Sequence, residues 1–371
     1  MVTRHDSYDL SRRNTFGMKV SCRLFVEVTD PEDLLTLDFD SLPQPLFVMG
    51  GGSNLLFTGD FPGTVLHLAI RFLHPCGVRN DKETVIPGDS PSVIPSEAKE
   101  SLLVTVGAGV VFDDFCAWVA SEGLWGPENL SLIPGEVGAS AVQNIGAYGV
   151  EAKDIIDTVH AFDLQERRFV DIPGSACGYG YRTSLFKTDW KGRYLITSVT
   201  FCLSTVPQPK LDYGGVRKAL GDRELSPVVI RETIIGIRRE KLPDPEEIGS
   251  AGSFFCNPVI EREHFERIVA TAKKDNGPEY EVPHYDVGDR VKVPAAWMID
   301  QCGFKGMRLG GAQVYPKQPL VIVNATGEAT SDEIVALEQR VIGTIREKYG
   351  VELHPEVEHV GTQLTVNQRI K

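Results

Sequence analysis

The sequence predicts an α+β protein of two or three domains, and three observations predict this class. The chain has 371 residues, more than one ordinary domain holds. Its composition, with 42% hydrophobic and 24% charged residues, is typical of a globular protein with a large core. Apolar runs typical of strands recur along the chain, and stretches with the apolar stripe of a helix lie between and after them.

The first predicted elements lie before residue 80. Cys22 to Val28 alternates as a strand does, and Pro31 to Leu37 suits a short helix. The apolar run from Leu46 to Met49 predicts a strand that feeds directly into a glycine turn. Residues 79–101 are rich in Pro, Ser and charge without periodicity, which indicates a surface hairpin tip or insertion without an assigned function.

The middle of the chain continues the α+β pattern. Leu102 to Val106 predicts a buried strand, and an apolar helical stripe follows over residues 112–120. Asp113 and Asp114 in the first turn, with Gly123 after the end, suit the dipole and the cap of that helix. Further strands are predicted around Val159 to Leu164, Phe169 to Ile172 and Tyr194 to Leu203.

The last third predicts three helices and a turn. A helical stretch lies between proline-bearing patches from Pro207 to Pro243, and Gly249 to Pro258 suggests a Gly/Ser turn. A helix is expected from Glu261 to Lys274, with Phe265, Ile268, Val269 and Ala272 on one face. Thr330 and Glu333 form a capping-box pattern before an apolar stripe that ends at Gly350.

The net charge excludes one class of function. With 38 basic and 51 acidic residues the chain carries a formal charge of −13, so general nucleic-acid binding is not expected. A phosphate-bearing ligand would have to be held locally. Backbone N–H groups in glycine-rich turns are the simplest way to do this.

The sequence also favours a cytoplasmic protein. The longest apolar stretches, such as Leu320 to Val323, are far too short for a membrane span, and the N-terminus has no signal-peptide pattern. The seven cysteines are odd in number, scattered and never spaced as CxxC, so reduced thiols are expected. The eight histidines show no metal-like pairing, and no metal site is predicted.

Two glycine-rich segments could hold a dinucleotide. The first follows the strand that ends at Met49 and can bring several N–H groups against a pyrophosphate, although a tight turn is an equal alternative. The second runs from Pro134 to Gly149, and its small and amide-bearing residues suit a flat ring or a ribose. The alternative for the second is a buried turn that packs two sheets.

The ordered set of motifs resembles one family through nearly the whole chain. The motifs are Asn14–Gly17, Gly51–Leu55, Gly107–Gly109, Ile133–Gly135, Gln143–Glu151, Tyr179–Lys187, Lys241–Pro245, Ala251–Phe255, Asn257–Pro258, Leu309–Ala312 and Pro355–Val357. Together they resemble the UDP-N-acetylenolpyruvoylglucosamine reductases. The first two blocks are shared with related oxidases, whereas the Tyr-Arg-x-Ser, Gly-Ser-Phe-Phe and Pro-Glu-Val blocks point to this reductase.

The resemblance implies a fold and an activity. The fold would be the FAD-binding fold of the vanillyl-alcohol oxidase type in two parts, residues 1–60 (completed by 350–371) and 61–242, with an α+β substrate domain at 243–349. The implied enzyme is a cytoplasmic monomer that binds FAD and takes hydride from NADPH. It would then reduce UDP-N-acetylglucosamine enolpyruvate to UDP-N-acetylmuramate in a ping-pong cycle of peptidoglycan precursor synthesis.

Three residues are implied as catalytic, and their chemistry suits the reaction. Arg182 offers a planar, permanently charged fork for the substrate carboxylate, with a surface salt bridge as the alternative. Ser253 could protonate the carbanion-like carbon in a dry site walled by phenylalanines; the alternative is a turn serine. Glu356 could orient or share a proton with the intermediate, and solvent exposure is its alternative.

The resemblance also implies the contacts of substrate and cofactor. Substrate contacts are Tyr181, Tyr213, Lys241, Asn257, Lys305 and Gln318, of which Tyr213 is the expected lid over bound substrate. Cofactor contacts are Gly50, Gly51, Gly52, Ser53, Asn54, Leu55, Pro134, Gly135, Gly138, Ser140, Asn144, Gly146, Ala147, Tyr148, Gly149 and Arg238. For Arg238 a plain helix-surface position is nearly as good an interpretation. Cys256 departs from the family, whose members often have a basic residue there.

Two other functions stay open at this point. An FAD oxidase of the same fold would act on another alcohol or hydroxy acid, consume oxygen and not need Ser253. A flavin-binding scaffold without turnover would tolerate replacement of Arg182, Ser253 and Glu356.

Overall fold

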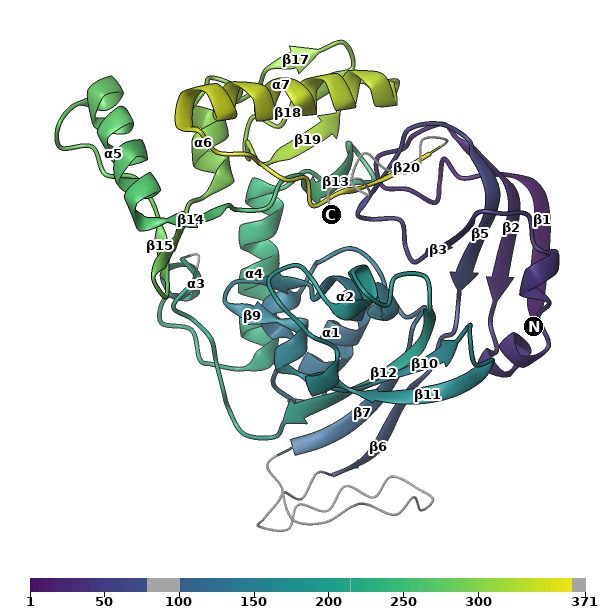
Figure 1. Cartoon of the computed structure of the whole chain (residues 1–371). Helices are drawn as coiled ribbons and strands as arrows, with labels where there is room; N and C mark the ends of the chain where they lie inside the picture. Colours follow the sequence, from purple (N-terminus) through teal and green to yellow (C-terminus); the bar gives the residue numbers. More distant parts are fainter. Residues whose placement is uncertain (79–100, 214, 362–371) are drawn as a thin grey trace. The chain divides into compact units, whose positions relative to one another are not determined.

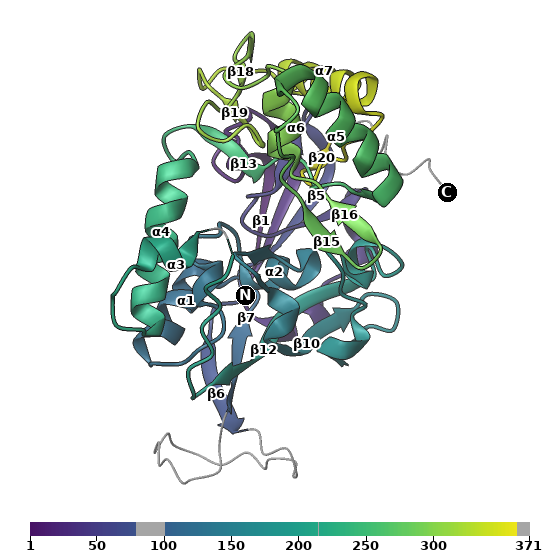
Figure 2. The same ribbon diagram turned by 90° about the vertical axis from the view of Figure 1, so that its left-hand side faces the viewer.

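The computed structural model describes residues 1–78, 101–213 and 215–361 (Figures 1 and 2). Its contacts divide the chain into two compact units. The first unit comprises Met1–Tyr8, Cys22–Gly52 and Pro62–Glu240. The second unit comprises Asp9–Ser21, Ser53–Phe61 and Lys241–Lys371. The division into regions 1–60, 61–242 and 243–349 stays a prediction.

The first sheet of the first unit has four strands in the order β1-β2-β5-β3. They are β1 (Val2–Asp9), β2 (Ser21–Val28), β5 (Phe61–Leu68) and β3 (Leu46–Met49). β3 runs parallel to β5. The strands predicted near residues 22–28 and 46–49 are confirmed. The predicted helix after Pro31 is the shorter 3₁₀ helix η1 (Pro31–Leu35), capped by Asp30, and a second 3₁₀ turn is η2 (Phe39–Ser41).

The second sheet of the first unit has five antiparallel strands in the order β11-β10-β12-β7-β6. They are β6 (Leu73–Val78), β7 (Ser101–Gly107), β10 (Ile156–Asp163), β11 (Arg168–Pro173) and β12 (Tyr194–Ser204). All four strands predicted between residues 102 and 203 are confirmed. The predicted insertion at 79–101 lies, apart from Ser101, outside the described residues.

Two helices pack on this sheet. They are α1 (Phe112–Ser121) and α2 (Val137–Gln143). The predicted stripe of α1 is buried, and its Phe115 ring stacks on Phe201 of β12 at 4.5 Å between centroids. The same core includes Val104 of β7 and Val137 of α2. This packing fixes the start of α2, which follows the second glycine-rich segment directly.

Short elements and one long helix complete the first unit. The short ones are η3 (Glu128–Leu130), β8 (Gly146–Ala147), β9 (Val150–Glu151), η4 (Ala152–Asp154), η5 (Gly174–Ala176), η6 (Leu185–Lys187) and α3 (Val216–Leu220). The helix predicted between the proline patches is α4 (Pro227–Lys241). It is anchored to α1 by the ion pair of Arg231 with Asp113, whose second oxygen lies 2.9 Å from Nη2.

The described part of the second unit, up to residue 361, contains three small sheets and three helices. Its strands are β13 (Gly249–Ser253), β19 (Val321–Asn324), β18 (Ala312–Val314), β17 (Arg308–Leu309), β14 (Val259–Glu261), β16 (Arg290–Lys292), β15 (Tyr285–Val287), β4 (Leu55–Phe57) and β20 (Glu358–Val360). Its helices are α5 (Arg262–Asn276), α6 (Ala295–Gln301) and α7 (Ser331–Tyr349). β4 and β20 pair in parallel, although they lie near opposite ends of the chain.

The predicted Gly/Ser turn at 249–258 is wrong, because its first half is strand β13. β13 pairs with β19, and the register shifts between Ser250 and Ser253. The backbone of Phe16 comes so close to residue 249 that only glycine fits, since a Cβ there would lie 2.3 Å from the carbonyl oxygen of Phe16. Gly252 has a φ of +71°, which fits the irregular register. The glycines therefore serve a strand and its bulge.

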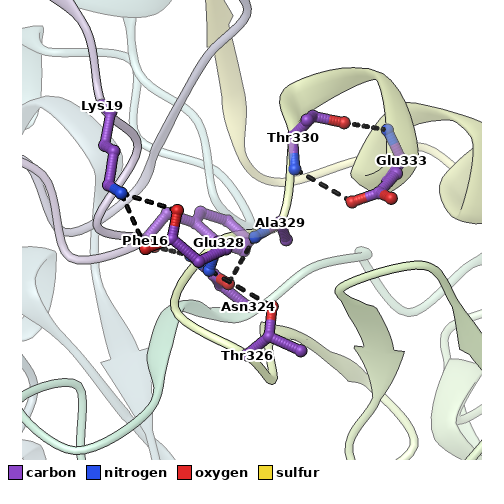
Figure 3. A network of polar contacts seen from close by, with 8 residues as sticks. All are labelled: Phe16, Lys19, Asn324, Thr326, Glu328, Ala329, Thr330 and Glu333. Atoms are coloured by element: carbon purple, nitrogen blue, oxygen red, sulfur yellow. Dashed lines mark hydrogen bonds and ion pairs between the residues drawn. The ribbon is translucent and has the colours of Figure 1, made fainter.

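Helix α7 confirms its predicted start and end. The Thr330 hydroxyl accepts from the Glu333 N–H at 3.2 Å, and the Glu333 carboxylate accepts from the Thr330 N–H at 3.0 Å (Figure 3). Asn324, at the end of β19, donates to the Phe16 carbonyl and accepts from the Ala329 N–H (Figure 3). α5 also agrees with its prediction, except that Val269 is only half-buried.

Within the described ranges, no helix combines the length and the apolar composition that crossing a bilayer requires. Cys22, Cys116 and Cys177 are buried free thiols. Burial raises the pKa of Cys22 to about 11. Such a thiol stays protonated and unreactive at neutral pH.

Candidate cofactor and substrate site

The two glycine-rich segments touch each other in the first unit. A Cβ at Gly51 would lie 3.4 Å from the Cα of Gly135, and a Cβ at Gly50 would lie 3.3 Å from the Cβ of Ala139. Gly52 has a φ of +66°, which a residue with a side chain rarely adopts. Side chains at these positions would fill the space between the segments. The bare backbone surface suits a dinucleotide, as the sequence predicts.

A buried histidine, His67, lies beside both glycine-rich segments. His67 of β5 lies opposite Met49 of β3, the residue before Gly50. Its Nδ1 is 2.9 Å from Oε2 of Glu27, and its Nε2 is 3.0 Å from Oε1 of Glu136. Glu136 follows Gly135 directly, and its other oxygen would lie 3.3 Å from a Cβ at Gly50.

The electrostatics of this Glu27–His67–Glu136 cluster favour the imidazolium. Burial by itself lowers the pKa of His67, but the hydrogen bonds and charges of Glu136 and Glu27 outweigh it, so the pKa is raised above its ordinary value of 6.5. Sequence reasoning missed this cluster. The three residues are far apart in the chain, and although Glu136 lies in the second glycine-rich segment, no sequence pattern pairs it with Glu27 or His67.

Part of the second segment serves packing. Gly138 donates its N–H to the Ala108 carbonyl at 3.0 Å, and Ser140 donates to the Glu136 carbonyl at 3.0 Å. A Cβ at Gly138 would lie 2.9 Å from the Cβ of Ala108. For these two residues the geometry supports the packing interpretation, because their N–H groups are used within the protein. Their role as cofactor contacts stays a prediction.

The Arg182 loop is bound to the second half of that segment. Asn144 is buried and left-handed, with a φ of 48°, and its Nδ2 donates to the Gly180 carbonyl at 2.7 Å. The Arg182 guanidinium donates to the Gly146 carbonyl. Two further side chains after Arg182 also donate to this part of the chain. Ser184 Oγ donates to the Val142 carbonyl at 2.7 Å, and Lys187 Nζ donates to Gln143 Oε1 at 2.6 Å.

Arg182 itself is held in an uncommon conformation. Its φ is 56°, a region that costs a non-glycine residue about 1 kcal/mol or more. Its guanidinium lies 5.2 Å from the ring centroid of Tyr181, which is 39% exposed. The carbonyl and the ring orient the guanidinium, as an anion-binding arginine requires.

Arg238 lies beside Tyr148 in the first unit. Its Nε is buried and finds no hydrogen-bond partner among the described residues. Burial lowers the pKa of Arg238, while Tyr148 and Asp113 act in the opposite direction. The plain helix-surface interpretation does not account for a buried N–H, whereas an acceptor on a bound ligand would.

Tyr213 lies against the end of the second segment. A Cβ at Gly149, whose φ is +82°, would lie 3.3 Å from the Cβ of Tyr213. The Tyr213 side chain is 36% exposed. The predicted lid residue is therefore next to the predicted cofactor residue Gly149. Ala147 belongs to β8.

Ser253 and Glu356 lie in the second unit, joined through one residue. Glu356 donates its N–H to the Phe254 carbonyl at 2.8 Å, directly after Ser253. Asn54 donates to the Glu356 carbonyl at 3.1 Å and accepts from the Glu358 N–H at 3.0 Å. Phe254 and Phe255, which follow Ser253 directly, are fully buried with ring centroids 5.2 Å apart, and the apolar wall around the serine hydroxyl stays a prediction.

The remaining candidates are placed as follows. Ser53 accepts a weak bond from Thr15 at 3.4 Å, and Leu55 begins β4. Asn257 Oδ1 accepts from the Ala295 N–H at 2.9 Å at the start of α6. Lys305 lies 3.9 Å from Asp300, and the Gln318 carbonyl accepts from Val321 in the turn before β19. Lys241 ends α4. Pro134 precedes Gly135 in the contact described above.

The structure thus forms two groups of predicted residues, one in each unit. Arg182, Tyr181, Tyr213 and the second glycine-rich segment belong to the first unit. Ser253, Glu356 and Asn54 belong to the second unit. In the described part of the chain no group of three or more His, Cys, Asp or Glu could hold a metal ion.

Comparison with known proteins identifies the family. An FAD binding domain matches residues 24–166, and the C-terminal domain of UDP-N-acetylenolpyruvoylglucosamine reductase matches residues 244–360. A UDP-N-acetylenolpyruvoylglucosamine reductase of Bacteroides fragilis (strain YCH46) is 44% identical over 358 residues, which cover 95% of this chain and 99% of that protein. The chain belongs to the UDP-N-acetylenolpyruvoylglucosamine reductase family. The resemblance predicted from the motifs is confirmed.

Other members and one solved structure agree. A UDP-N-acetylenolpyruvoylglucosamine reductase of Porphyromonas gingivalis (strain ATCC BAA-308 / W83) is 40% identical over 366 residues, covering 97% of this chain and 100% of that protein. The crystal structure of the reductase from Thermus caldophilus shares the fold, with a TM-score of 0.62, 22% identity and coverage of 97% and 98%. The predicted α+β FAD-binding fold is confirmed. This member of the reductase family is an FAD-dependent oxidoreductase.

Proposed function

We propose that this protein reduces UDP-N-acetylglucosamine enolpyruvate to UDP-N-acetylmuramate with NADPH, through bound FAD, in peptidoglycan precursor synthesis. The names of its relatives support the substrate. The observation that carries the proposal is the hydrogen bonding of the Arg182 loop to the second glycine-rich segment, which supports a role for Arg182 in binding an anion beside the proposed cofactor surface. The proposal includes a cytoplasmic monomer, which light scattering after size exclusion would check.

The residues present fit FAD. The contact of Gly51 with Gly135 leaves backbone exposed where side chains would otherwise lie, and the buried Nε of Arg238 needs an acceptor. The Gly50–Leu55 and Pro134–Gly149 segments and Arg238 would therefore hold the cofactor. When bound, FAD would supply the hydride that adds to the terminal carbon of the enol ether, after taking it from NADPH.

Arg182 is proposed to bind the substrate carboxylate. Negative charge moves toward that carboxylate when hydride adds to the double bond, so a fixed cation stabilises the transition state more than the substrate. The Gly146 carbonyl and the Tyr181 ring hold the guanidinium in place before substrate arrives. Tyr181, Tyr213, Lys241, Asn257, Lys305 and Gln318 are proposed to bind the rest of the substrate.

Ser253 is proposed to donate its hydroxyl proton to the carbon next to the carboxylate, which completes addition of hydride and proton across the double bond. A hydroxyl is a weak acid and needs a dry, preorganised site. The buried rings of Phe254 and Phe255 support this requirement. Glu356 is proposed to orient the intermediate, from a backbone fixed by Phe254 and Asn54.

Anaerobic stopped-flow absorbance of the flavin tests the proposal. NADPH should bleach the flavin, and addition of the UDP-enolpyruvyl sugar without oxygen should restore it. Ser253→Ala should bleach normally and recover at least about 100-fold more slowly, the usual effect of removing a positioned acid. The exposed Ser175→Ala is the matched control.

Other outcomes would favour other functions. Reoxidation by oxygen but not by the sugar would indicate an oxidase. A stable flavin spectrum that neither NADPH nor the sugar changes would indicate a binding scaffold. An unchanged recovery rate in Ser253→Ala would remove the proposed role of that serine.

A further inference from the structure

Asn129 connects the two loops that carry Tyr148 and Tyr213. It lies in η3 and is fully buried. Its Nδ2 donates one hydrogen bond to the Tyr148 carbonyl and another to the Lys210 carbonyl, each of 2.8 Å. Tyr148 belongs to the predicted cofactor segment, and Lys210 lies three residues before Tyr213. One side-chain amide thus holds both loops.

The packing around this amide holds the same two loops. Leu211 is buried in an apolar cluster with Trp125 and the inner face of α4, and Tyr148 packs against that cluster. Beyond Leu211 the chain becomes exposed at Asp212. The base of the Tyr213 loop is therefore fixed at Lys210 and Leu211, and Tyr213 lies against Gly149 just past this base.

The chemistry of the side chain suits this role. An amide NH₂ offers two donors from one nitrogen, which a hydroxyl or a carboxylate does not. Oδ1 of Asn129 is buried and has no hydrogen-bond partner within the described residues, so the donors are what the site uses. The neighbouring Glu128 accepts from the Gly126 N–H at 2.6 Å, and Ser131 Oγ donates to the Glu128 carbonyl at 2.7 Å, which fixes η3 itself.

We propose that Asn129 is a positioning residue for substrate binding: it sets the Tyr213 loop against the Tyr148–Gly149 cofactor loop, and acts on the substrate through Tyr213. The proposal rests on the proposed function. Asn129 is none of the proposed catalytic residues, and its printed bonds go to two backbone carbonyls. Its loss should therefore weaken sugar binding and leave the chemical step and the bound cofactor unchanged.

Asn129→Asp tests this, because it keeps the shape and replaces both donors with acceptors that face two carbonyl oxygens. We expect full FAD content and flavin reduction by NADPH within about twofold of wild type. The KM for the UDP-enolpyruvyl sugar should rise at least about tenfold, equivalent to about 1.4 kcal/mol, with kcat within about threefold. The exposed Asn276→Asp is the control.

A double-mutant cycle with Tyr213→Ala separates positioning from general damage. In the Tyr213→Ala background Asn129→Asp should raise KM less than about twofold, because its effect passes through the tyrosine. Equal increases in both backgrounds, or an unchanged KM in the single variant, would overturn the proposal. If Asn129→Asp does not fold, Asn129→Ala is measured in the same cycle with the same criteria.

The two proposals fail in different ways. A wild-type protein whose reduced flavin is not reoxidised by the sugar would overturn the proposed function, and this inference with it. An active wild type with an additive cycle would overturn the role of Asn129 alone.

Discussion

Replacing His67 with leucine should destabilise the protein and loosen its cofactor. The side chain is 2% exposed and bridges Glu27 and Glu136. Leucine can be buried in place of the imidazole, but it cannot pair with a carboxylate. The Glu136 carboxylate, 9% exposed and beside Gly50, therefore loses its cationic partner. The Glu27 carboxylate, 26% exposed, keeps more of its hydration. The loss should therefore arise mainly at Glu136.

The magnitude follows from these exposures. Removing one partner of a buried ion pair costs about 3–5 kcal/mol. Since one of the two carboxylates remains partly hydrated, we expect a loss near the lower end, about 3 kcal/mol, in the free energy of unfolding at pH 6.5. Adding Glu136→Gln to His67→Leu removes the unpaired charge and should recover roughly half of that loss.

The same histidine predicts a pH dependence. The folded state raises the pKa of His67 above 6.5, so the folded protein binds this proton more tightly than the unfolded chain. The resulting stability is fully present below about pH 6.5 and is lost as pH rises through the folded-state pKa. Wild type should lose stability over this interval relative to His67→Leu, which has no such proton.

Urea unfolding from pH 5.5 to 9, followed by far-UV circular dichroism, measures both effects, and flavin retained after gel filtration reports the cofactor. A His67→Leu variant within about 0.5 kcal/mol of wild type at pH 6.5 would refute the argument. So would parallel pH profiles of the two proteins, because the imidazolium would then contribute nothing.

Two further predictions concern the second glycine-rich segment. Gly138→Ala should lower the free energy of unfolding by about 1–3 kcal/mol in a denaturant titration, since its Cβ would lie 2.9 Å from that of Ala108; Gly343→Ala, at a helical glycine of α7 where the added Cβ meets no atom within 4 Å, is the matched control without a clash. Lys187→Met removes the bonds to Gln143 Oε1 at 2.6 Å and to the Arg182 carbonyl at 3.4 Å, and should weaken sugar binding roughly tenfold in a flavin-absorbance titration while FAD stays bound. An unchanged affinity, with exposed Lys274→Met as control, would contradict a role in holding Arg182.

Local signals explain which elements could be predicted. α7 has its capping box, its apolar stripe and its terminal glycine within one stretch of sequence. α1 has acidic residues in its first turn, an apolar stripe and a glycine just past its end, although no side chain caps its start. β13 could not be recognised in the same way. Its glycines indicate a turn in isolation, and only the pairing with β19 and the approach of Phe16 show that they belong to a strand.

The candidate site divides in the same manner. The glycine-rich segments and the Arg182 motif are continuous in sequence, so their residue types could be interpreted directly. Glu27 lies in β2, His67 in β5 and Glu136 at the N-cap of α2, so no local pattern shows that they meet. Asn129 donates to two backbone carbonyls, which a residue of any type could supply. Hydrogen bonds to backbone atoms depend on the fold, not on the identity of the acceptor residue.

The pairing of β4 with β20 affects how the protein is made. Leu55 lies opposite Glu358, and Asn54 binds the carbonyl of Glu356. Ribosomes add about 5–20 residues per second, so roughly 15–60 s pass between synthesis of these two strands. Among the described residues β4 pairs with β20 alone, so during that time it lacks this partner, and Asn54 lacks the carbonyl to which it donates. The first glycine-rich segment therefore reaches its final conformation only when nearly the whole chain has been translated, and nascent chains that end before residue 355 should not retain FAD.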